Sequence, residues 1–228
     1  MSEMLTVSPG WYAAHPGATY GLIAFRGVQN PSSHEGINAA ATKLENAVRQ
    51  RFSPEDRDAL RVTPPLPAYA AYYKRWGQRY HVGMQLESVA LKDKPIPRVA
   101  ALVEAMFVSE LANLLLTAGH DLDQLALPVV LDSGAGQEFT APNGKTQTVK
   151  EGDMFTADAE GRVLSAVITG PSDVARISPE TTSALFYAYG PPGISAGEMS
   201  AHLDAIERNV RLISPDAVTV VREIIAAP

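Results

Sequence analysis

The residues best suited to chemistry are His120 and the adjacent Asp121, which follow a long apolar stretch. We expect that stretch to be a helix, and the partial negative charge at a helix C-terminus favours a protonated imidazole. Asp121 could orient the imidazole of His120 for acid/base chemistry. It could equally cap the following turn, residues 122–125, through its side-chain oxygens. The sequence leaves both interpretations open.

A second group of polar residues lies between positions 169 and 182. Residues 169–172 (Thr-Gly-Pro-Ser), Arg176 and the pair Thr181-Thr182 supply hydroxyls, backbone donors and a guanidinium near the ends of predicted strands. These groups suit a small polar ligand, and they suit an ordinary loop equally well.

Known catalytic and cofactor motifs match poorly. Residues 193–197 fit the G-x-S-x-G pattern, but a nucleophilic serine needs a strand that runs directly into its turn. Here Pro191-Pro192 intervene, and Ser195 with Glu198 forms a capping box that predicts a helix start. The Ser-Gly-Ala-Gly run at 133–136 lacks the third glycine of a dinucleotide-binding loop.

The residue types that usually bind metals are scarce or scattered. The chain has no cysteine, and its five histidines show no spacing typical of metal ligands. We therefore expect no disulfide, no metal and no other cofactor.

The elements that must position these groups are organised around one long predicted helix from Arg98 to about Gly119. Its apolar residues cover most of the circumference, so we expect it to be buried with the rest of the fold around it. Glu104, Glu110 and Asn113 interrupt the apolar run, which is also too short for a membrane span.

Other helices are predicted at 35–51, from a start at 53–56, at 68–76, at 85–91 and at 196–212. The helix at 68–76 carries an aromatic stripe formed by Tyr69, Tyr72, Tyr73 and Trp76. At helical spacing such a stripe is more typical of core packing than of a base-stacking platform.

Strands are predicted at 19–28, 127–131, 137–140, 146–149, 154–157, 163–169 and 183–189. The tail from Asp216 to Ile225 is ambiguous between helix and strand. We expect one α+β domain over residues 1–228. Its helical part covers about 35–125, its strand-rich part about 126–190 and its C-terminal helix about 196–212, with the helices on one side of antiparallel sheets.

The charge distribution limits the classes of partner. The net charge of −6 argues against non-specific nucleic-acid binding. Residues 49–98, however, hold ten Lys/Arg and five Asp/Glu, whereas the rest of the chain holds nine and twenty. This local basic surface could contact a polyanion, although a solvated helix face is the commoner meaning of such a run. The N-terminus lacks the pattern of a signal peptide, so we expect a cytoplasmic location.

Several segments together resemble the B3/B4 domain family, which occurs in the β subunit of bacterial phenylalanyl-tRNA synthetase and in stand-alone synthetase-like proteins. They cover nearly the whole chain: Pro16-Gly17, Gly21, Gly27-Val28, Tyr72 to Gly77, Gln85 to Leu91, Pro97, Leu102-Val103-Glu104, Gly119 to Leu125, Gly152-Asp153, Ala157 to Gly161, Ile177 to Thr182 and the strand Ala184–Tyr189.

The resemblance implies a three-layer β/β/α fold, with two packed, mostly antiparallel sheets and helices on one face. In the synthetase this domain hydrolyses tyrosine mischarged onto phenylalanine tRNA. The family's pocket asparagine, histidine and glutamate correspond here to Phe107, Ala118 and Tyr187, and His120 lies two positions from the histidine's place.

We therefore expect a stand-alone domain that binds an aminoacyl-tRNA or related aminoacyl adduct and, if catalytic, hydrolyses it. His120 would position water or substrate with Asp121 orienting it, Arg176 would hold a phosphate or carboxylate, and backbone near Gly170 the ester carbonyl. The expected pocket comprises Glu87, Ser109, His120, Asp121, Asp158, Thr169, Gly170, Arg176 and Tyr187.

The alternative is a non-catalytic module on the same scaffold that binds a free amino acid or small metabolite. Loss of the family's pocket residues and the acidic balance favour it. A protein-interaction domain is a third hypothesis, and it would require a large exposed apolar patch. We expect no membrane partner, and the sequence favours no particular oligomeric state.

Overall fold

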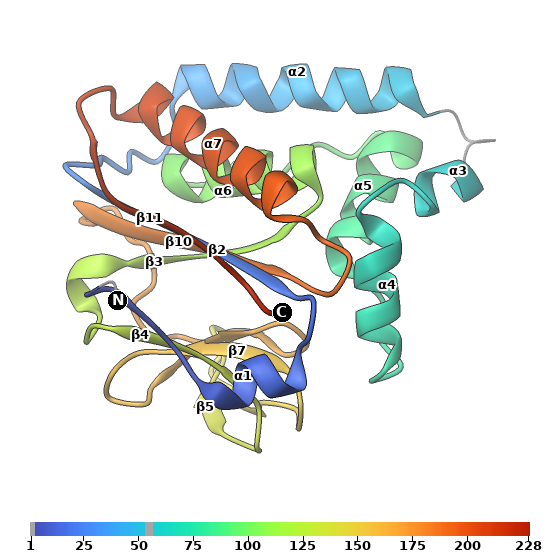
Figure 1. The fold of residues 1–228 in the computed structure, drawn as a ribbon. Coiled ribbons are helices and arrows are strands. Elements are labelled where there is room, and N and C mark those ends of the chain that lie inside the picture. Colours follow the sequence, from blue (N-terminus) through green and yellow to red (C-terminus); the bar gives the residue numbers. More distant parts are fainter. Residues whose placement is uncertain (1–2, 53–56) are drawn as a thin grey trace.

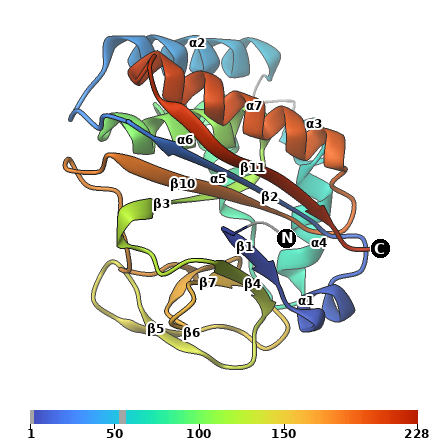
Figure 2. The same cartoon turned by 60° about the vertical axis from the view of Figure 1, so that its left-hand side comes forward.

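The centre of the fold is a four-stranded antiparallel sheet in the order β11-β2-β10-β3 (Figure 2). The computed structural model describes residues 3–52 and 57–228. The strands of this sheet are β2 (Thr19–Arg26), β3 (Leu116–Asp121), β10 (Ser183–Gly190) and β11 (Val218–Ala226). β10 is buried along its whole length and β2 along all but its last residue, because both faces of the sheet are covered.

A second sheet packs against one face of the first, in the order β1-β4-β7-β8-β9 (Figure 1). Its strands are β1 (Leu5–Val7), β4 (Val129–Ser133), β7 (Met154–Ala157), β8 (Val163–Ala166) and β9 (Gly170–Pro171). β1 pairs with β4 in parallel and the other pairs are antiparallel. A separate hairpin of β5 (Glu138–Thr140) and β6 (Thr146–Thr148) projects away from it (Figure 2).

Helices cover the outer face of the first sheet. The long ones are α2 (Glu35–Arg51), α6 (Ala101–Asn113) and α7 (Ala196–Ile213) (Figure 1). At one end lie α3 (Arg57–Arg61), α4 (Leu66–Lys74) and α5 (His81–Lys92), whereas α1 (Pro9–Ala14) lies beside β4 and a 3₁₀ turn, η2 (Leu122–Gln124), follows β3. The expected α+β, three-layer fold is confirmed.

Most predicted elements are present with small shifts at their ends. Helix α7 begins with the capping box of Ser195 and Glu198, and the ambiguous tail forms strand β11. The tyrosines of α4 are at most 4% exposed, so the aromatic stripe is core packing. The predicted helix start at 53–56 lies outside the described residues. In the part of the chain that is described, no helix is long and apolar enough to cross a membrane.

The helix predicted to reach Gly119 is wrong in its last six residues. α6 ends at Asn113, Leu114 turns the chain with a φ of 59°, and β3 follows. A short apolar run fits a buried strand as well as a buried helix, and pairing with β10 decides for the strand. Gly119 is not a helix stop: a Cβ there would lie 2.8 Å from the ring of Phe186 on β10.

Candidate functional site

A partly enclosed cleft of about 380 Å³ lies between α6, β3 and the edge of the second sheet. Its apolar wall comes mainly from α6 and β3, and β8 with the loop after it closes the opposite side. Its polar lining residues are His81, Glu110, Thr117, His120, Ser165, Ser172, Arg176 and Tyr189. A wider but shallow hollow follows the outer face of α2, where exposed helix surface forms the lining. We therefore place the candidate site in the cleft.

A chain of hydrogen bonds runs from the cleft wall into the space between the sheets. The hydroxyl of Tyr187 on β10 lies 3.0 Å from Nε2 of His120 and 2.8 Å from Oγ of Ser165 on β8. Ser165 Oγ contacts the Tyr189 hydroxyl at 3.0 Å, and Tyr189 donates to Thr156 on β7 at 2.8 Å. All five side chains are buried. We call this set the interlayer network, because it joins β3 and β10 to β7 and β8.

The imidazole of His120 is neutral and held in one tautomer. Nδ1 lies 3.2 Å from the carbonyl oxygen of Val174, and a carbonyl only accepts, so Nδ1 carries the proton and Nε2 accepts from Tyr187. Burial lowers the pKa of His120 to about 4, although contacts with backbone groups oppose the shift. The expected protonated imidazole at a helix end is wrong, because His120 lies in a strand.

Asp121 points away from His120 and caps the following turn. Successive strand residues face opposite sides of a sheet, and the Asp121 carboxylate accepts from the backbone N–H of Asp123 at 3.1 Å and from the Thr181 hydroxyl at 2.8 Å. Within the described residues it has no hydrogen bond to His120. Of the two interpretations of Asp121, the structure therefore supports the cap of η2.

Three further expected residues lie in or beside the cleft. Gly170 and Arg176 line it, and Arg176 is largely exposed, with an ion pair of 3.4 Å to Asp173. Tyr187 lies behind the wall, where it contacts His120. The neighbouring Thr169 has a buried hydroxyl without a hydrogen bond among the described residues.

The structure does not bring the remaining three to the cleft. Glu87, buried on α5, forms an ion pair of 2.9 Å with Arg57 of α3. Ser109 faces α7, to which it is hydrogen-bonded at 2.8 Å. Asp158 accepts from Arg162 at 2.7 Å in the turn between β7 and β8. Each of these side chains has a structural partner.

Sequence reasoning missed several cleft residues, of which Glu110 is the most unusual. It is 4% exposed, lines the cleft from α6 and accepts the backbone N–H of Thr117 at 2.9 Å. Burial raises the pKa of Glu110 to about 8. The available signal was a carboxylate in a mostly apolar helix, which Glu104 shares. Ser165 and Tyr189 carried no signal, because serine and tyrosine are common in strands.

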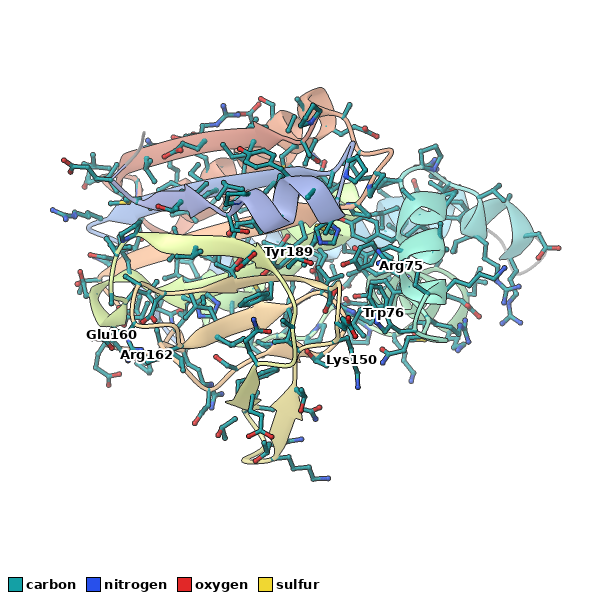
Figure 3. The ribbon with its side chains drawn as sticks, turned by 60° about the horizontal axis from the view of Figure 1, so that its bottom comes forward. Arg75, Trp76, Lys150, Glu160, Arg162 and Tyr189 are labelled. Atoms are coloured by element: carbon teal, nitrogen blue, oxygen red, sulfur yellow. The ribbon has the colours of Figure 1, made fainter. Side chains whose placement is uncertain are left out.

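The basic segment 49–98 is partly neutralised by contacts within the protein. Arg98 pairs with Glu45 at 2.9 Å, and Arg49 pairs with Asp93 at 2.8 Å. The guanidinium of Arg75 lies 4.5 Å above the Trp76 ring, and both side chains are seen beside α4 in Figure 3. These contacts favour the solvated-surface interpretation of this charge run.

Comparison with known proteins gives a weak structural counterpart and no family. No family model and no curated protein matches the chain. One similar solved structure is an N-terminal fragment of the phenylalanyl-tRNA synthetase β subunit from Pyrococcus horikoshii, with 11% sequence identity and a TM-score of 0.48. The match covers 97% of this chain and 50% of that one. A likeness this weak does not bear on function, and the B3/B4 resemblance stays a prediction.

The buried imidazole predicts a pH-dependent contribution to stability. The pKa of His120 in the folded protein, about 4, lies below the ordinary value of 6.5. The imidazole therefore contributes its full share to the free energy of unfolding above pH 6.5, and this share is lost as the pH falls towards 4. Replacing His120 with asparagine should lower the free energy of unfolding more at pH 7 than at pH 5, by on the order of 2 kcal/mol. Urea unfolding of both proteins at both pH values measures this, and other titrating groups cancel in the difference. An equal cost at the two pH values would contradict a buried neutral imidazole.

Proposed function

We propose that the chain binds a free amino acid, or the aminoacyl part of a larger molecule, in the cleft. The observation that carries this proposal is a volume of about 380 Å³ with an apolar wall and a few fixed polar groups. Small-molecule sites have this character, because apolar surface supplies affinity and a few polar groups set orientation. The apolar wall includes Val103, Met106, Phe107, Leu116 and Ile177, so the preferred side chain is large and apolar.

Two of the polar groups suit the carboxyl end of such a ligand. Arg176 lines the cleft and pairs with Asp173 through Nη1 alone, which leaves its other guanidinium nitrogens to hold a carboxylate or, in an aminoacyl adduct, a phosphate. Gly170, with a φ of 84°, turns the backbone beside it and could present an amide to the ester carbonyl. The interlayer network is rigid because each of its polar atoms has a partner, so it supports a preformed wall.

Binding is tested with L-phenylalanine, whose side chain matches the apolar wall. At 10 mM it should raise the melting temperature of the protein by a few degrees, because a ligand selective for the folded state stabilises it. Met106→Trp, which fills the cleft from the partly exposed face of α6, should abolish the shift. Leu212→Trp, at an exposed position on α7, should leave it unchanged.

Two results would reject the proposal. One is the absence of a shift with every large apolar amino acid tested. The other is a Met106→Trp protein that folds normally and binds as the wild type does.

Hydrolysis of an aminoacyl-tRNA is the second candidate function, and the observation that favours it is an imidazole on the wall of the cleft. A general base needs a free lone pair, and here the Tyr187 hydroxyl occupies Nε2 of His120. Hydrolysis would therefore require that hydroxyl to move aside. This requirement is why the geometry supports binding better than catalysis.

A panel of mischarged tRNAs tests the second candidate. If His120 is the base, His120→Ala should abolish release of the amino acid, and Tyr187→Phe, which frees Nε2 and keeps the imidazole, should retain at least the wild-type rate. Binding to tRNA should weaken steeply with salt, because counterions are released when phosphates are neutralised. Unchanged turnover in His120→Ala would reject the role of His120, and no turnover in the wild type would reject hydrolysis.

A further inference from the structure

Glu110 is a buried carboxyl group that has no cationic partner in the part of the chain that the structure describes. Its Oε1 accepts the backbone N–H of Thr117 at 2.9 Å, and Oε2 has no hydrogen bond within residues 3–52 and 57–228. Over the same residues, no Lys, Arg or His nitrogen forms an ion pair with it. Buried acids are normally paired, and Glu104 on the same helix illustrates the rule with Arg98 at 3.5 Å. Glu110 differs from Glu104 because it lines the cleft.

The phenol groups that face Glu110 stay neutral near physiological pH. They belong to Tyr69 and Tyr73 on α4 and to Tyr80 just before α5, and burial raises the pKa of each above its ordinary value. A neutral phenol cannot compensate a carboxylate charge, so this side of Glu110 favours the protonated acid.

The nitrogen bases around Glu110 do not compensate it either. His120 and His202, the latter bonded to the Thr117 hydroxyl, have pKa values lowered by burial to about 4 and about 3. Burial also lowers the pKa of His81 on α5. Arg176, across the cleft, is paired with Asp173. Between pH 7 and 8.5 Glu110 is therefore the one group of this set that changes charge.

We propose that Glu110 recognises the ammonium group of the ligand in the cleft and loses its own proton when the ligand binds. This inference rests on the proposed function and names the group that binds the ligand's ammonium group. The free protein holds a neutral carboxylic acid, and the ligand arrives as R–NH₃⁺. In the complex the carboxylate accepts hydrogen bonds from the intact ammonium, and the carboxyl proton leaves to solvent.

The proposal makes affinity depend on pH in a defined direction. Burial holds the pKa of Glu110 at about 8 in the free protein, so at pH 7 binding must first remove a proton. Affinity for an amine-bearing ligand should rise roughly eightfold from pH 7.0 to 8.5, where Glu110 is mostly ionised and the amine still charged. A ligand without the amine should show no such rise.

Titration calorimetry tests this with three probes that share a benzyl group: L-phenylalanine, phenethylamine and 3-phenylpropanoate. Measurements at pH 7.0 in PIPES and in HEPES, which carry neither a phosphate nor a primary amine, give the number of protons released, because the two buffers differ in ionisation enthalpy. We expect nearly one proton released with each amine and none with 3-phenylpropanoate. Glu110→Gln should abolish the release and the pH dependence and weaken amine binding at least tenfold at pH 8.5, roughly the loss of one charge-assisted hydrogen bond.

Glu104→Gln is the matched control, because it makes the same change at a buried position of α6 outside the cleft, and it should bind as the wild type does. Binding of the amines without proton release, or equal binding by Glu110→Gln, would overturn the role of Glu110 and leave the proposed function standing. Failure of the wild type to bind any of the three probes would instead overturn the proposed function, and this inference with it.

Discussion

The structure depends on the burial of polar groups between two sheets that are otherwise packed by apolar contact. Tyr187 and Tyr189 project from β10 towards the second sheet, where they contact Ser165 and Thr156, and Tyr187 also contacts His120 on β3. A buried polar atom that loses its partner costs about 1–3 kcal/mol, so these hydrogen bonds hold the two sheets in one relative position. The cleft lies at the edge of this region, and its shape depends on how the two sheets are placed relative to each other.

The connection from α6 to β3 sets the chemistry of the cleft. The left-handed turn at Leu114 reverses the chain direction within three residues, which brings the start of β3 back against the last turns of α6. As a result the backbone N–H of Thr117 reaches the carboxyl group of Glu110, seven residues earlier, at 2.9 Å. A continuous helix would have separated these groups, so the acid in the cleft is a consequence of the strand that the sequence did not predict.

Local patterns predicted those elements whose signals lie within a few residues. The cap at Ser195, the β-branched and aromatic residues of the strands and the helical spacing of the tyrosines are of this kind, and the fold class followed from the order of the elements. The end of α6 could not be predicted, because a buried apolar run has the same composition in a helix and in a strand. Candidate residues such as Glu87 and Asp158 were carried over from the family resemblance. Their contacts depend on how the loops and helix ends around them fold, and the spacing of residues in the sequence does not show this.

The tautomer of His120 tests the account most directly, because it reports on the interlayer network and on the cleft wall at once. Nitrogen-15 NMR of the imidazole at about pH 6 distinguishes the three forms of the ring. The structure predicts a neutral ring with the proton on Nδ1, bonded to the Val174 carbonyl, and a bare Nε2 that accepts from Tyr187. An imidazolium, or a neutral ring with the proton on Nε2, would contradict the network and the wall built on it.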